Sequence, residues 1–182
     1  MIDNIERIKK LSRRLKKILI IILIIIPFLL AGYWIFYNNL PSSAKIKIEH
    51  KDAIMNFTTQ SKYIRMGGFL AGMLPLSVVS IIILTLIKLL KLYENGDIFT
   101  EKNVRYYKKL GKLIIIWSIV NFIYRTLIAL ILTLPNQPGN RILQLSLESS
   151  DAVTVIIGII ALIIANVMEY GKTIEEEQQL TI

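Results

Sequence analysis

Four stretches of this 182-residue sequence are apolar for long enough to cross the hydrocarbon core of a lipid bilayer. They cover residues 18–36, 66–90, 113–134 and 152–168. A soluble chain of this length has too few polar residues to cover four buried apolar helices. Hydrophobic residues make up 54% of the sequence, above the about 45–50% that is typical of soluble domains. The sequence therefore predicts an all-α membrane protein with four transmembrane helices in one domain over residues 1–182.

Basic residues are unevenly distributed around these stretches. Fifteen lie before the first stretch, around the connection between the second and third, or after the fourth, whereas six belong to the other two connections. Cytoplasmic segments of membrane proteins are enriched in lysine and arginine. We therefore expect a multi-pass protein of the cell membrane with both termini and the middle connection in the cytoplasm. Insertion and contact with anionic membrane lipids explain this charge, so we expect no direct contact with nucleic acid.

The segment before the first stretch is basic and has helical periodicity. Ile5, Ile8, Leu11 and Leu15 recur on one face of a helix, with arginine and lysine largely on the other faces. Residues 1–17 are therefore predicted to form a basic amphipathic helix on anionic headgroups, unless their charge serves only to set the topology. The first apolar stretch is longer than the core of a signal peptide, so a retained anchor is the better interpretation.

An internal similarity appears at an offset of 75 residues. Residues 92–101 align without gaps to residues 167–176, with glutamate and glycine at matching positions. Residues 45–49 and 143–148, which both follow a Leu-Pro pair, alternate apolar and polar side chains as short strands do. The pattern predicts two parallel helix-strand-helix pseudo-repeats. The two alternating segments would then pair as a small two-stranded β cap outside the membrane.

The connection between the second and third apolar stretches contains signals for a helix end and a helix start. Gly96 suits the left-handed residue that ends a helix, and Thr100 suits the N-cap of the next helix, which we expect to begin near Glu101. Phe99 would then dip into the membrane interface or cover the end of the bundle. The motif is therefore predicted to be a tight turn with apolar anchors, or else a docking site for a partner.

The residues after the fourth stretch, 169–182, form an acidic tail that is predicted to lie in the cytoplasm. Its candidate contact residues are Gly171, Ile174, Glu175, Glu176 and Glu177. The three consecutive glutamates are opposite in charge to the basic middle connection, so we expect the tail to fold back on that connection. A solvated acidic tail is the alternative.

A charged residue inside the third apolar stretch requires a polar environment. Arg125 lies near the middle of this stretch, where a charge costs about 2.5–3.5 kcal/mol on insertion scales. Ser118 and Asn121 share its helical face, so the three residues form an intramembrane polar stripe. The candidate partners of the stripe are Asp151, Ala71 and Ser77, with Glu148 further out. The stripe would lock helices together through hydrogen bonds, form a permeation or lipid-headgroup site, or relay protons or anions.

Two motifs resemble the signatures of a known family. The first is Gly-Asp-Ile-Phe-Thr at residues 96–100, followed by Asn103, and the second is residues 171–182, which end in Glu-Glu-Glu-Gln-Gln-Leu-Thr-Ile. With these motifs the chain resembles family 2975 of the domain-of-unknown-function series over nearly its whole length. The resemblance implies a small bacterial membrane protein with four helices, no established activity and no catalytic residues to transfer. It also implies a partner, because relatives are often encoded beside a small helix-turn-helix regulator.

The sequence lacks the residue patterns of catalytic sites. It has no cysteine and one histidine, and it shows no nucleophile with a base, no metal-ligand spacing and no phosphate-binding glycine loop. We therefore expect no enzymatic activity, no cofactor and no metal. Two functional classes are left: a regulatory membrane protein whose cytoplasmic motifs contact a partner, or a small transport, channel or envelope-protection component. A protein of the second class would use the polar stripe. It would act as a homo-oligomer, because four helices enclose little space.

Overall fold

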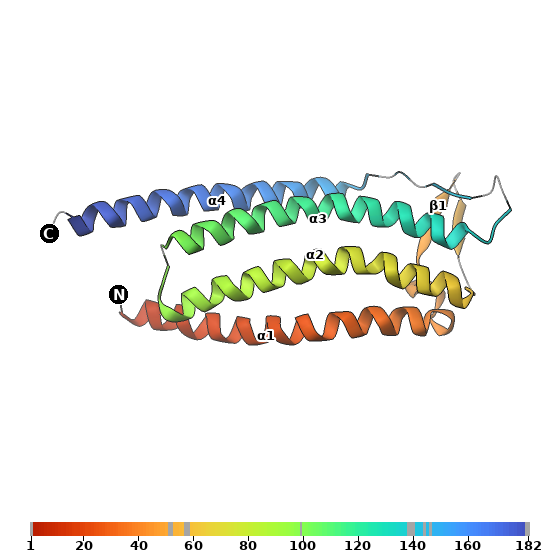
Figure 1. Cartoon of the computed structure of the whole chain (residues 1–182), viewed down its shortest axis with the longest axis horizontal. Coiled ribbons are helices and arrows are strands. Elements are labelled where there is room, and N and C mark those ends of the chain that lie inside the picture. Colours follow the sequence, from red (N-terminus) through yellow and green to blue (C-terminus); the bar gives the residue numbers. More distant parts are fainter. Residues whose placement is uncertain are drawn as a thin grey trace. The chain divides into compact units, whose positions relative to one another are not determined.

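The computed structural model describes residues 2–50, 53–56, 59–98, 100–137, 141–143, 145 and 147–180. Within these residues the chain forms four long α-helices (Figure 1). They are α1 (Ile2–Ile35), α2 (Lys62–Asn95), α3 (Glu101–Thr133) and α4 (Ser149–Leu180). By length and composition, each contains a segment able to cross a membrane, which confirms the all-α prediction with four spans.

The helices extend well beyond the apolar stretches. α1 begins at Ile2, so the predicted basic segment and the first apolar stretch form one helix. α3 begins at Glu101, as the N-cap signal predicted. The acidic segment after residue 168 continues α4 to Leu180 and is not a separate tail. Glutamate, glutamine and leucine are strong helix formers, and their abundance in that segment explains its helical conformation.

The chain divides into two compact units. The terminal unit contains Met1–Ile24, Val78–Ser118 and Ser149–Ile182, and therefore all of α4. The hairpin unit contains Ile25–Ser77 and Ile119–Glu148. α1, α2 and α3 each contribute residues to both units. Each unit has its own close contacts between helices.

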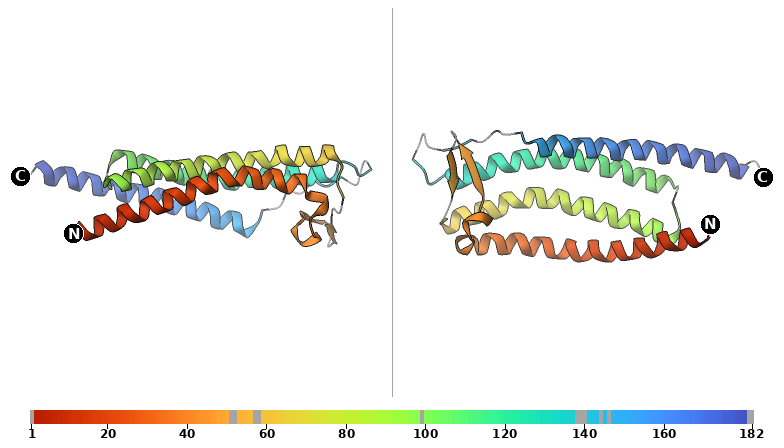
Figure 2. Two further views of the ribbon diagram at one scale, coloured as in Figure 1. Left: turned by 90° about the horizontal axis from the view of Figure 1, so that it is seen from below. Right: turned by 180° about the vertical axis from the view of Figure 1, so that it is seen from behind.

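A short β-hairpin belongs to the hairpin unit. Figure 2 shows its two strands side by side, β1 (Lys47–His50) and β2 (Ala53–Asn56), and they pair antiparallel along their whole length. The prediction that residues 45–49 pair with residues 143–148 is therefore wrong. The described residues of that second segment are neither strand nor helix. Because β2 follows β1 directly, the hairpin closes a much shorter loop and loses less conformational entropy than the predicted pairing would.

The segments that align in sequence also differ in structure. Residues 92–101 contain the end of α2 and the start of α3, whereas residues 167–176 lie inside α4. Thr100 aligns with Glu175, and glutamate is not among the residues preferred at an N-cap. The prediction of two helix-strand-helix pseudo-repeats is therefore wrong for these segments, and the second strand is absent from the described residues after α3.

Aromatic side chains at the end of α1 organise the core of the hairpin unit. Trp34 and Tyr37 are stacked, with ring centroids 5.2 Å apart and an angle of 11° between the ring planes. They pack with buried residues of α2, of α3 and of the segment after α3, namely Ile64, Ile128, Ala129, Leu132 and Ile142. Tryptophan and tyrosine are enriched where a membrane protein meets the headgroup region, so this cluster suits a position at the membrane interface.

Candidate functional site

The turn after α2 closes with two backbone hydrogen bonds. The amide of Asp97 donates to the carbonyl of Leu92 at 3.0 Å. The amide of Gly96 donates to the carbonyl of Tyr93 at 3.1 Å. These two bonds define a Schellman motif, which places a left-handed residue just after the helix. Gly96 supplies it with a φ of +93°, so the predicted helix stop is confirmed.

The start of α3 is held by Thr100 and Asn103. The Thr100 hydroxyl accepts a hydrogen bond from the Asn103 amide at 3.4 Å, as an N-cap residue does. The Asn103 side chain is fully buried, and its Nδ2 donates to the carbonyls of Asp97 and Ile98, each at 2.6 Å. One side chain therefore ties the turn to the first turn of α3. Phe99, also predicted for this motif, lies outside the described residues.

We expect the substitution Asn103→Ala to destabilise the protein by roughly 2 kcal/mol, because two carbonyls next to α3 lose their donor. The expected result is a lower melting temperature of the purified protein in detergent, measured by circular dichroism. Lys102→Ala is the matched control, since Lys102 is exposed one position earlier in α3. Equal melting temperatures for the two variants would contradict this role of Asn103.

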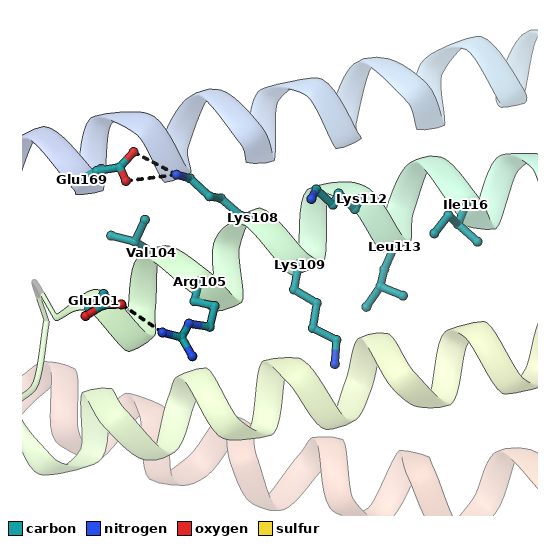
Figure 3. Close-up of a pocket in the computed structure, with 9 residues that line it drawn as sticks. All are labelled: Glu101, Val104, Arg105, Lys108, Lys109, Lys112, Leu113, Ile116 and Glu169. Carbon is teal, nitrogen blue, oxygen red and sulfur yellow. Dashed lines mark hydrogen bonds and ion pairs between the residues drawn. The ribbon is translucent and has the colours of Figure 1, made fainter.

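Beside this turn, one face of α3 borders an open hollow of about 540 Å³ in the terminal unit (Figure 3). We call this surface the α3 hollow. Its lining consists of Glu101, Val104, Arg105, Lys108, Lys109, Lys112, Leu113, Ile116 and Glu169. All but Glu169 recur at helical spacing along α3, whereas Glu169 comes from α4. The hollow therefore combines four basic side chains with three aliphatic ones.

Two of the basic side chains in the α3 hollow form ion pairs. The Lys108 ammonium donates to both carboxylate oxygens of Glu169, at 3.0 and 2.9 Å, and so connects α3 to α4. Arg105 pairs with Glu101 one helical turn earlier, at 2.9 Å. Both pairs are exposed to a large extent, so each contributes only about 0–1 kcal/mol to stability. Their main effect is to neutralise half of the positive charge in the hollow.

The other two basic side chains, Lys109 and Lys112, are exposed. Neither forms an ion pair with any residue in the described part of the chain. Figure 3 shows Lys109 leaving α3 on the side away from Glu169. Two charges of the hollow are therefore free to meet an anionic group from another molecule.

Among the described side chains of α4, the acidic residue that pairs with the basic face of α3 is Glu169. The side chains of Glu175, Glu176 and Glu177 lie outside the described part of the structure. Gly171 and Ile174 lie within α4, and Ile174 is exposed. Because α4 continues as a helix through this region, the three glutamates extend that helix, and their contact with the middle connection stays a prediction.

A second group of ion pairs joins α1 to the end of α2. Glu94 accepts a hydrogen bond from Arg13 Nε at 2.9 Å and another from the Lys16 ammonium. The basic part of α1 therefore has a protein partner as well as a charge suited to lipid headgroups. Glu94 is not among the predicted site residues, although it is the single carboxylate in α2 and could have been recognised for that reason.

The predicted polar stripe on α3 is divided between the two units. Ser118 is buried in the terminal unit, where its hydroxyl donates to the main-chain oxygen of Asp151 at 3.4 Å. Asn121 and Arg125 belong to the hairpin unit and are half-buried. There the Nε of Arg125 lies 3.7 Å from Oε1 of Glu148. Arg125 therefore has an ion-pair contact with Glu148, which the sequence placed further out than Asp151.

The two candidate partners on α2 have different environments. Ala71 is buried in the hairpin unit. Ser77 is exposed, and its hydroxyl donates to the carbonyl of Leu74 at 2.7 Å within α2 itself. The Ser77 hydroxyl is therefore used inside its own helix.

The family described as "Protein of unknown function (DUF2975)" matches residues 41–182 of the chain. The chain belongs to the DUF2975 family. No curated protein and no solved structure matches it. With its four apolar helices, this DUF2975 member is a multi-pass membrane protein of unknown function, as the sequence motifs predicted.

The DUF2975 match includes the turn after α2 and every residue that lines the α3 hollow. It begins after α1, so Arg13 and Lys16 lie outside it whereas their partner Glu94 lies inside it. The α3 hollow therefore combines an apolar surface with two free positive charges inside the DUF2975 region.

Proposed function

We propose that this DUF2975 protein is a membrane-resident interaction protein and that its α3 hollow binds an acidic segment of a cytoplasmic partner. The observation that carries the proposal is the presence of two exposed lysines, Lys109 and Lys112, that form no ion pair with a described residue and lie in a hollow with an apolar part. A row of solvated lysines on a polar helix would not suggest a binding surface. Free lysines beside an exposed apolar side chain do suggest one, and Ile116 in this hollow is 44% exposed.

The distribution of basic residues supports a cytoplasmic position for the terminal unit. This unit contains all fifteen basic residues of the predicted cytoplasmic segments, and the hairpin unit contains the six of the outer connections. Lysine and arginine near the ends of membrane spans favour the cytoplasmic side. A soluble cytoplasmic protein would therefore have access to the α3 hollow.

An amphipathic acidic helix fits the chemistry of this surface. Its carboxylates would pair with Lys109 and Lys112, and its apolar face would contact Leu113 and Ile116 at the membrane surface, where the third apolar stretch begins. Exposed ion pairs contribute only about 0.2–1 kcal/mol each, so the apolar contact must supply much of the affinity. The partner class that the family resemblance implies is a small helix-turn-helix regulator, and a second copy of this chain is the alternative.

We expect the double substitution Lys109→Gln/Lys112→Gln to reduce partner recovery about tenfold, because both free charges of the hollow are lost. The measurement is quantitative affinity purification of the full chain from native membranes, with bound proteins identified by mass spectrometry. Recovery should also fall as salt concentration rises, since exposed ion pairs are screened.

The matched control is Lys88→Gln/Lys91→Gln, which removes the same charge from exposed positions of α2 in the same unit. This control should retain the partner at the wild-type level. A chain truncated after Tyr170 keeps Glu169 but loses the acidic end of α4, so it tests whether that segment contributes. Equal recovery with both double variants would contradict the proposal.

A transport, channel or envelope-protection role through the polar stripe is the second candidate. Its basis is the half-buried Arg125 on α3 within a predicted span. We place it second because Glu148 supplies an opposite charge, which suits a structural role for Arg125. An Arg125→Leu variant that keeps the partner but changes self-association or lipid recovery in the same experiment would favour this candidate.

A further inference from the structure

A second cavity lies in the hairpin unit, between the end of α1 and the start of α2. Its volume is about 400 Å³, and we call it the α1–α2 cavity. Its apolar lining comes from Ala31, Trp34, Ile35, Met66 and Phe69. Lys62 and Arg65, about one helical turn apart, complete the lining, and no described acidic side chain contributes to it. We propose that this cavity binds an anionic phospholipid, with the phosphate at the two basic residues and an acyl chain along the apolar wall.

Two of the donor atoms around the α1–α2 cavity have no acceptor among the described residues. Arg65 is anchored by one nitrogen, Nη1, which donates to the carbonyl of Ile35 at 2.7 Å. Its Nε is buried and has no acceptor among the described residues, and the same is true of the indole Nε1 of Trp34. Lys62 adds an exposed ammonium group. A phosphate diester has several acceptor oxygens and a negative charge, and therefore complements the Lys62 ammonium and the Arg65 guanidinium that line the cavity.

The position of the cavity along the helices suits a headgroup site. Lys62 and Arg65 directly precede the apolar stretch of α2, and Trp34 belongs to an aromatic cluster typical of the membrane interface. Ile35 and Met66, on the two sides of the cavity, are 62% and 60% exposed. In a membrane, such exposed apolar side chains contact lipid. A phospholipid whose phosphate lies at the basic residues would thus have an acyl chain against the apolar wall.

The same features favour a lipid with net negative charge over other occupants. A zwitterionic headgroup would bring its own cation close to two basic side chains, with no described carboxylate in the lining to receive it. A peptide would bury main-chain amides against a wall that offers no side-chain acceptor. An acyl chain has no polar groups to satisfy. Charge complementarity therefore points to a lipid such as phosphatidylglycerol.

Native mass spectrometry of the full chain, titrated with phosphatidylglycerol or phosphatidylcholine of equal chain length, tests this inference. We expect the wild type to bind the first phosphatidylglycerol about tenfold more tightly than phosphatidylcholine. The double substitution Lys62→Gln/Arg65→Gln should remove this preference. Ala31→Phe, which fills the apolar part of the cavity and leaves both charges in place, should also weaken binding of phosphatidylglycerol.

Two further variants separate the site from general charge and from misfolding. Lys47→Gln/Arg141→Gln removes two exposed charges elsewhere in the same unit and should keep the lipid preference. Lys62→Arg/Arg65→Lys preserves the charge and should keep most of the affinity, and melting temperatures verify folding of every variant. Equal phosphatidylglycerol binding by all variants would overturn the proposal. A dimer peak that disappears with Lys62→Gln/Arg65→Gln would assign the cavity to a second copy and would also overturn it.

Discussion

Substitution of Gly68 by alanine is expected to destabilise the hairpin unit by about 3 kcal/mol or more. A Cβ atom at this position would lie 2.1 Å from Cη2 of Trp34, and 2.4 and 2.5 Å from two further atoms of the same ring. The ring cannot move away easily, because Trp34 is 2% exposed and stacked on Tyr37. Either the indole or the backbone of α2 must shift. Thermal unfolding in detergent, followed by circular dichroism, measures the effect.

Gly32→Ala provides the matched control for this substitution. A Cβ at Gly32 meets nothing within 4 Å, and Gly32 lies in α1 of the same unit. Alanine is a better helix former than glycine, so this control should melt at or above the wild-type temperature. The double variant Gly68→Ala/Trp34→Leu should recover part of the lost stability, since the clashing ring is gone. A Gly68→Ala variant as stable as Gly32→Ala would show that Trp34 does not press on α2.

The second large effect is expected at the contact between α3 and α4 in the terminal unit. A Cβ at Gly111 would lie 2.6 Å from Cγ of Leu162 and 2.9 Å from the carbonyl oxygen of Gly158. A Cβ at Gly158 would lie 2.7 Å from Ile115 and 3.0 Å from the carbonyl oxygen of Gly111. Small residues let the backbones of membrane helices approach closely. Because a backbone atom cannot rotate away, the helices themselves must separate.

We therefore expect Gly111→Ala to cost roughly 3 kcal/mol and to weaken the association of α3 with α4. The chain has no cysteine, so a Lys108→Cys/Glu169→Cys background reports the proximity of the two helices through a bifunctional maleimide. Crosslinking in this background should slow when Gly111→Ala is added and should be unchanged when Gly32→Ala is added. Unchanged crosslinking and melting in Gly111→Ala would contradict a close helix contact at this glycine.

The α3 hollow depends on the same contact. Glu169 reaches the hollow from α4, and Gly111 and Gly158 bring α4 close to α3 a few turns away. If the helices separate, Lys108 loses its carboxylate partner and the hollow gains a third free positive charge. Close packing at the two glycines therefore helps to keep Lys108 paired and so limits the positive charge of the proposed binding surface.

Features that depend on residues close together along the chain could be predicted without the structure. Four long apolar runs set four helices, because backbone groups in a bilayer must bond within their own helix. The turn after α2 was also predictable, because Gly96 and Thr100 act on backbone groups at most a few residues away. Family membership also followed from local motifs.

Contacts between residues far apart along the chain could not be predicted, because they depend on how the helices pack. Periodicity identified residues 45–49 as a strand candidate, but the shorter loop to β2 determined its partner. Charge suggested that an acid meets the basic face of α3, yet the position of α4 selected Glu169. The partner of Arg125 and the tight fit of Gly68 against Trp34 likewise depend on how helices pack. A sequence pattern specifies the face of a helix, whereas packing specifies which residues that face contacts.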